Sequence, residues 1–160
     1  MSAPEVFRLG GDRLVAFGEE SVDTLLGYRQ LDTGAFEAGG VLLGRIILAT
    51  GDVVIDQVTT PCSNDLRSRY RFLRSRTGAQ ARVHQAWIDS QGTRIYLGEW
   101  HSHPEPHPSP SRQDIDDWRR VARKARYEQS FLLFVILGTQ SLCVWCVERG
   151  SSRPTLLERR

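Results

Sequence analysis

The chain has 160 residues, of which 40% are hydrophobic and 25% are charged, and its formal net charge is +2. These values are typical of one globular domain, and they argue against a disordered chain, a fibrous repeat and a strongly basic nucleic-acid-binding protein. We therefore predict a single domain over residues 1–160, with its core in residues 5–148 and a polar tail at 149–160 that frays.

The N-terminal half predicts four strands and one helix, from alternating or continuous apolar residues in the strands and an apolar stripe of helical spacing in the helix. In chain order they are the strands 6–9 and 13–17, the helix 19–30, and the strands 41–48 and 53–58. The two glycine-containing turns, at 10–12 and 51–52, indicate that consecutive strands pair. We expect the second pair to lie at the centre of the sheet.

An arginine-rich insertion follows at residues 60–76, where arginines alternate with Tyr70 and Phe72. One interpretation is a solvated edge strand or loop with its arginines pointing outward. The other is a contact surface for an acidic protein partner or a terminal carboxylate, in which Arg67, Arg69 and Arg71 would bind substrate. No recognised nucleic-acid-binding motif accompanies these residues, so we expect no nucleic-acid partner.

The C-terminal half predicts two helices and three strands. In chain order they are the helix 77–90, the strand 94–100, the helix 111–126 and a hairpin of strands 131–137 and 142–147. The first of these helices is indicated by the pattern Ala81, His84, Gln85 and Ile88 with Trp87, and Gly92 should stop it. Helices interleaved with mixed strands favour an α/β or α+β sandwich, with one mixed sheet flanked by about three helices.

Cysteine usage and hydropathy bear on the compartment. Three cysteines are an odd number, which fits a reducing compartment better than a disulfide framework. Cys143 and Cys146 are three residues apart in a predicted strand, so their side chains should point to opposite faces. The apolar runs are too short to span a bilayer, and the first residues lack the pattern of a secretory signal. We expect a cytoplasmic protein with no membrane partner.

Three of the four histidines lie within seven residues, at His101, His103 and His107. The first two are two residues apart at the end of a predicted strand, so both rings leave the same face. Asp114 begins the next helix and returns a carboxylate toward them. Two imidazoles and one carboxylate with a free fourth position predict one catalytic zinc ion per chain. His107, among the prolines, is interpreted as a surface or substrate-contacting residue.

Ser111 and Asp114 also form a typical helix-capping pair. The cap would place the Ser111 hydroxyl where it can face a developing oxyanion, whereas Asp114 bound to zinc should not be free to complete the capping box. A zinc-bound water also needs a general base. Glu37, Glu99 and Glu105 are candidates, and spacing alone does not choose among them.

The chain resembles the JAMM metallopeptidases, also called JAB or MPN-plus domains. The residues that carry the likeness are His101-Ser-His103, then seven residues to Ser111 and two more to Asp114, with a glutamate before Gly39-Gly-Val-Leu-Leu-Gly44. The resemblance implies an MPN fold of the cytidine-deaminase-like kind. It also implies zinc held by His101, His103 and Asp114, Glu37 as general base, and Ser111 supporting the tetrahedral intermediate.

The resemblance further implies hydrolysis of an isopeptide or peptide bond after the extended C-terminal tail of a ubiquitin-like protein, bound along a sheet edge. Within the family, the segments 96–104 and 110–118 resemble the bacterial JAB proteases of CBASS antiphage operons. Those proteases remove a conjugated nucleotidyltransferase from its targets. Two alternatives are a JAB peptidase that processes a ubiquitin-like or sulfur-carrier protein, and a non-catalytic MPN scaffold. Scaffolds of that kind typically lack a ligand that this chain has.

Overall fold

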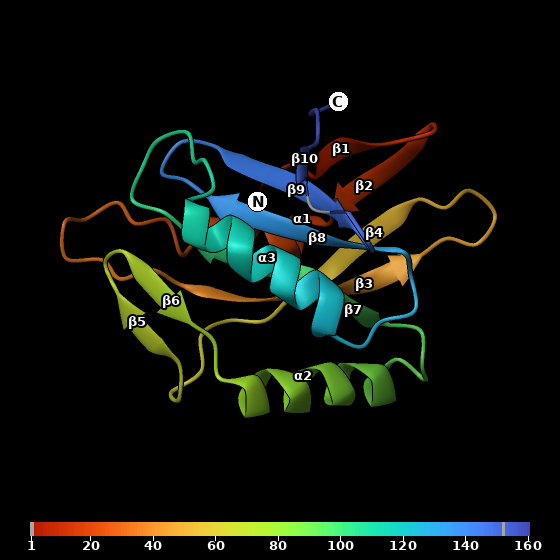
Figure 1. The fold of residues 1–160 in the computed structure, drawn as a ribbon, viewed down its shortest axis with the longest axis horizontal. Coiled ribbons are helices and arrows are strands. Elements are labelled where there is room, and N and C mark those ends of the chain that lie inside the picture. The colour runs from red at the N-terminus through yellow and green to blue at the C-terminus, as the bar shows by residue number, and fades with distance from the viewer. Residues whose placement is uncertain (1, 152) are drawn as a thin grey trace.

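A computed structural model of the chain describes residues 2–151 and 153–160, and within them it contains ten strands and three helices (Figure 1). The strands are β1 (Glu5–Gly10), β2 (Arg13–Phe17), β3 (Gly39–Ile46), β4 (Val53–Val58), β5 (Leu66–Ser68), β6 (Arg71–Leu73), β7 (Ile95–Ser102), β8 (Phe131–Leu137), β9 (Leu142–Glu148) and β10 (Thr155–Leu156). The helices are α1 (Glu19–Leu26), α2 (Arg76–Asp89) and α3 (Arg112–Lys124).

Eight strands form one mixed sheet in the order β1-β2-β4-β3-β7-β8-β9-β10. The pairs β2–β4 and β7–β8 are parallel, and the other neighbouring strands are antiparallel. The predicted mixed sheet with three helices is therefore confirmed, as is the central position of β3 and β4. Within the arginine-rich insertion, β5 and β6 pair only with each other and form a separate two-stranded hairpin.

Helices cover the two faces of the sheet in different ways. On one face, α1 buries Val22 and Leu25 in the largest apolar cluster, which draws side chains from most strands. On the other, α3 packs Trp118 against Phe134 of β8, with ring centroids 5.0 Å apart, and α2 lies beside β3 and β7 (Figure 1). Since every residue of β8 is buried, this strand lies between two apolar layers, as its continuous apolar sequence requires.

The C-terminal tail is part of the sheet, so the expectation that it frays is wrong. β10 pairs with β9, and beyond it Arg159 forms a bridge with Phe7 of β1. Leu157 is buried in the main core, and the Arg159 guanidinium forms an ion pair with Glu5. The tail therefore connects the two edges of the eight-stranded sheet and curls it. This closure depends on long-range pairing, which the polar sequence of the tail does not indicate.

Three local predictions need correction. α1 ends at Leu26, not at 30, because Gly27 caps it and the following amides make tighter turn bonds, such as Tyr28 N–H to Leu25 O. β3 begins at Gly39 and ends at Ile46, and Leu48 lies in an exposed turn. The main sheet also includes β10, which lies beyond the last predicted strand, 142–147.

The helix predicted at 77–90 is present as α2, but the pattern that indicated it does not mark its buried face. Ala79 and Ala86 are its buried residues, whereas Ile88 is 50% exposed. Small side chains let this helix approach β3 and β7 closely, and they carry little hydrophobic signal in the sequence. None of the helices in the described ranges combines the length and apolar character needed to cross a bilayer.

Candidate metal centre

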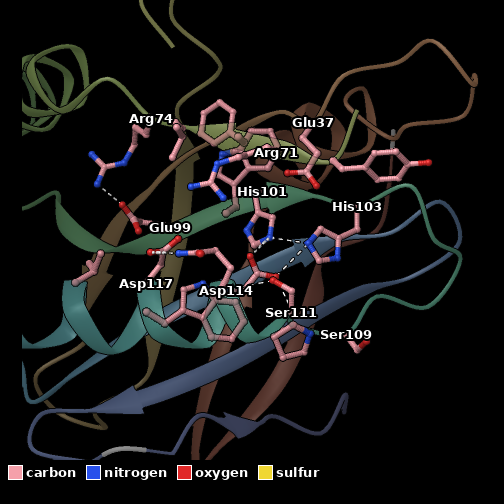
Figure 2. A pocket seen from close by; sticks show the side chains of 18 of the residues that line it. Glu37, Arg71, Arg74, Glu99, His101, His103, Ser109, Ser111, Asp114 and Asp117 are labelled. Atoms are coloured by element: carbon pink, nitrogen blue, oxygen red, sulfur yellow. Dashed lines mark hydrogen bonds and ion pairs between the residues drawn. The ribbon is translucent and has the colours of Figure 1, made fainter. Parts of the chain in front are cut away.

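Strand β7 and helix α3 together place three metal-ligand side chains around one point. His101 is the penultimate residue of β7 and His103 follows the strand, so the two rings leave the same face. Asp114 lies in the first turn of α3, whose N-cap is Ser111. His101, His103 and Asp114 point toward one another in Figure 2, and each offers a ligand atom within 4.8 Å of the others. The predicted set is brought together.

The distances fit a tetrahedral metal ion. The two histidine Nε2 atoms are 2.9 Å apart, and the Asp114 oxygens lie 3.3 Å from Nε2 of His101 and 3.2 Å from Nε2 of His103. Ligands held at about 2.0–2.1 Å from a tetrahedral zinc ion are about 3.3 Å apart. All three side chains are partly buried. Two imidazoles and one carboxylate with this spacing can therefore hold a metal ion such as zinc.

Asp114 caps its helix and faces the histidines at the same time. Its Oδ2 accepts the backbone N–H of Ser111 at 2.8 Å, and the Ser111 Oγ accepts the N–H of Asp114 at 3.0 Å, which completes the capping box. Burial alone would raise the pKa of Asp114, but hydrogen bonds with His101 and His103 hold that pKa far below its usual value. Oδ2 thus completes the box and also faces His103, while Oδ1 faces His101.

Glu105 orients His103 through the ring nitrogen that does not face the other ligands. Its Oε1 lies 3.0 Å from Nδ1 of His103 and accepts the backbone N–H of Ser109 at 3.0 Å. Burial opposes protonation of His103, but hydrogen bonds with Asp114 and Glu105 outweigh it and raise the pKa of His103 to about 9. A carboxylate on the second ring nitrogen fixes the tautomer that presents Nε2 to a metal. Glu105, one of the three candidate bases, therefore orients the His103 ring.

Glu37 lies on the side of the histidine pair opposite Asp114 (Figure 2). Its side chain is only 5% exposed, and it lines one cavity of about 640 Å³ with His101, His103, Ser111 and Asp114. Burial, partly offset by the charge of His103, raises the pKa of Glu37 from 4.5 to about 7. Such a carboxyl group can take up and release a proton near neutral pH.

The β5–β6 hairpin holds the main chain of Glu37 in place. The Glu37 N–H donates to Ser68 O at 2.6 Å, and Arg67 Nε donates to the Glu37 carbonyl at 2.8 Å. Gly39, two residues after Glu37, is a glycine for a steric reason: a Cβ on it would lie 2.5 Å from the Phe72 ring of the same hairpin. The insertion therefore packs directly on the segment that carries Glu37.

A buried polar network, missed by the sequence analysis, connects this hairpin to β7. Ser102, fully buried between the two histidines in sequence, donates to Gln30 Oε1 at 2.9 Å and accepts the Ala38 N–H at 2.9 Å. Gln30 in turn donates to Arg69 O at 2.9 Å and Ala35 O at 3.2 Å. Ser102 lies in the motif, but Gln30 has no local signal that marks it as part of a site.

The remaining candidates divide between the cavity and the surrounding structure. Arg71 lines the cavity, and Glu99 also lines it but forms an ion pair with Arg74. Arg69 donates to the carbonyls of residues 32 and 33, so it supports a loop. His107 is exposed, contacts Ser141 Oγ at 3.0 Å through Nδ1 and is not among the residues that line the cavity.

Comparisons with known proteins agree with this geometry. A family model described as prokaryotic homologs of the JAB domain matches residues 21–147. A Pseudomonas aeruginosa protein named CD-NTase/cGAS isopeptidase is 37% identical over 131 residues, which are 82% of this chain and 81% of that protein. A Vibrio cholerae protein of the same name is 39% identical over the same shares. A solved structure from Desulfitobacterium hafniense, with 18% identity and a TM-score of 0.54, covers 90% of this chain and 88% of its own, and it supports the fold.

Proposed function

Because the chain belongs to the prokaryotic family of JAB domains, we propose that it is a zinc-dependent isopeptidase. Its substrate would be a nucleotidyltransferase of the CD-NTase/cGAS kind, joined through its C-terminal tail to lysines of other proteins. The observation that carries the proposal is the convergence of His101, His103 and Asp114 on one point, in a cavity that also contains the buried Glu37. The names of the relatives supply the substrate class.

His101, His103 and Asp114 would hold the zinc ion. When bound, zinc would polarise the scissile carbonyl and lower the pKa of a water molecule toward neutrality. Glu37, ionised near neutral pH, takes a proton from the attacking water while the water oxygen bonds to the carbonyl carbon. It then gives that proton to the departing lysine amine as the C–N bond breaks. Ser111 Oγ accepts the Asp114 N–H, so its own proton can be donated to the oxyanion.

The edge of β6 is the proposed binding site for the substrate tail. β5 is paired with β6 on one side, and its Ser68 carbonyl accepts the Glu37 N–H. Arg71, Phe72 and Leu73 of β6 line the cavity beside the metal centre. An extended tail added along β6 would bind through main-chain hydrogen bonds. Its last residue would then lie at the metal-ligand side chains. Arg71 is the proposed side-chain contact within the insertion.

The test uses two conjugates that differ only in the acceptor. In the first, a CD-NTase tail is joined to a lysine Nε; in the second, the same tail continues into a linear extension. Zinc-loaded wild type should cleave the first faster, and Glu37→Gln should retain zinc but cleave neither. Failure of zinc-loaded wild type to cleave either conjugate, or full activity of Glu37→Gln, would reject the proposal.

The alternative function is processing of a ubiquitin-like or sulfur-carrier protein, for which the same site would serve. Preferential cleavage of the linear extension would favour it. Substrate capture provides a second discrimination: tagged Glu37→Ala, zinc-loaded but inactive, is recovered from its native cells and the bound proteins are identified by mass spectrometry. A protein joined to lysines supports deconjugation, and a small carrier with a short extension supports processing. A protein that binds no zinc would instead be a scaffold.

A further inference from the structure

A second cavity, of about 960 Å³, lies between α2 and the C-terminal end of α3. Residues of both helices form its walls, and Tyr96 of β7 lines it between them. Arg74 also lines the cavity of the metal centre, where it forms its ion pair with Glu99, so the two cavities are neighbours. A volume of this size lies in the range of small-molecule binding sites. The proposed isopeptidase reaction makes no use of it.

The side chains that line this cavity carry positive charge and no negative charge. Five of them are basic, and neither aspartate nor glutamate is among the lining residues. The basic residues are Arg74, Arg76, His84, Lys124 and Arg126.

The charge is mostly uncompensated. Arg74 is balanced by Glu99, whereas Arg76, Lys124 and Arg126 form no ion pair with any residue in the described ranges. Like charges gathered in a concave surface create a positive potential that concentrates anions. The first turn of α2 also contributes Arg76 and Thr77 to this wall, and the N-terminal end of a helix favours negative charge nearby.

Tyr96 supplies an observation independent of charge. Its hydroxyl is buried, and no group in the described part of the chain forms a hydrogen bond with it. A buried hydroxyl without a partner is unfavourable, so such groups are uncommon in native proteins. Tyr96 lines the cavity, but its hydroxyl is enclosed, so a ligand oxygen satisfies this hydroxyl only once a neighbouring side chain moves to expose it.

We propose that this cavity binds a small ligand that carries two or more phosphate groups. The basic residues lie on two walls, Arg76 on α2 and Lys124 and Arg126 at the end of α3, so a ligand with two or more phosphate groups can pair with both walls. Arginine donates paired hydrogen bonds to phosphate oxygens. The ring of Tyr96 and the side chain of Val83 provide an apolar surface for the organic part of the ligand.

Isothermal titration calorimetry tests the proposal on the full chain, freed of metal so that the probe does not bind zinc. The probe is sodium tripolyphosphate at low salt, with orthophosphate for comparison. Tripolyphosphate should bind at least about ten-fold more tightly than orthophosphate, because it reaches both walls. The double variant Arg76→Ala/Arg126→Ala should weaken its binding about ten-fold or more, and Tyr96→Phe about three-fold.

The matched control is Arg123→Ala/Arg153→Ala, which removes the same charge from exposed residues that do not line the cavity. It should change the affinity less than about two-fold. Absence of tripolyphosphate binding, or equal weakening by the two double variants, would overturn the proposal. Tighter binding of hexaglutamate than of tripolyphosphate would also overturn it and would assign the cavity to an acidic protein segment. Thermal unfolding confirms that each variant is folded.

Discussion

Because Glu37 is buried, ionisation of its carboxyl group should lower the free energy of unfolding of the domain. Its pKa rises from 4.5 to about 7 through desolvation. Between these two values the folded chain binds more protons than the unfolded chain, so stability falls as pH rises through this window and is constant above it. At one pKa unit per 1.36 kcal/mol, the ionised side chain costs about 3 kcal/mol at pH 8 and about 1 kcal/mol at pH 5.

Glu37→Gln removes this cost, because glutamine has nearly the same shape and never ionises. Urea unfolding of the metal-free protein should show the variant to be more stable than wild type by about 3 kcal/mol at pH 8, and by only about 1 kcal/mol at pH 5. The metal must be absent, since its charge would favour the ionised carboxylate. A variant that is both more stable and inactive is the pattern expected of a residue retained for chemistry.

The control for this measurement is Glu128→Gln, which makes the same substitution at an exposed position. It should leave stability unchanged at both pH values. An equal gain for Glu37→Gln at pH 5 and pH 8 would show that packing, not ionisation, is responsible. No gain at pH 8 would show that the raised pKa of Glu37 is wrong, and with it the argument that this group exchanges protons near neutrality.

Four further variants test residues at or near the metal centre. Arg67→Ala should lower kcat roughly 5- to 10-fold with little change in KM in steady-state kinetics, because Arg67 donates a hydrogen bond to the Glu37 carbonyl. Arg71→Ala should instead raise KM. The opposite pattern would exchange the roles of the two arginines. Ser102→Ala should lower the free energy of unfolding by about 2–4 kcal/mol in urea, since it leaves two buried partners unpaired; a loss near zero would contradict the network. Glu105→Gln should weaken zinc affinity about 10- to 100-fold in chelator competition, and unchanged affinity would remove Glu105 from the support of His103.

Features that depend on neighbouring residues could be predicted from the sequence. A strand places His101 and His103 on one face, and a serine three residues before an acid begins a helix. These two local rules indicated which side chains belong to the ligand set, although the packing of α3 on the sheet brings their atoms together. The sheet was predictable for the same reason, because its strands are marked by continuous or alternating apolar residues.

Features that depend on long-range contacts could not be predicted. Gln30 and Ser102 are 72 residues apart and meet only in the folded chain, and a lone glutamine has no pattern that marks it as buried. The inner face of α2 consists of alanines, which contribute little to an apolar stripe. The tail closes the sheet through backbone pairing near Phe7, and backbone bonds leave no trace in side-chain composition.

Asp114 shows why capping and metal binding need not compete. A carboxylate has two oxygens with several acceptor positions, and here Oδ2 accepts the Ser111 N–H while Oδ1 lies 3.3 Å from His101. The bond that begins α3 also fixes the direction of the carboxylate before any metal binds. Because the helix is held to the sheet by Trp118 stacked on Phe134, packing of the core sets the distance between Asp114 and the histidines. The site is thus preorganised by the contacts that fold the domain, and metal binding need supply little of the ordering.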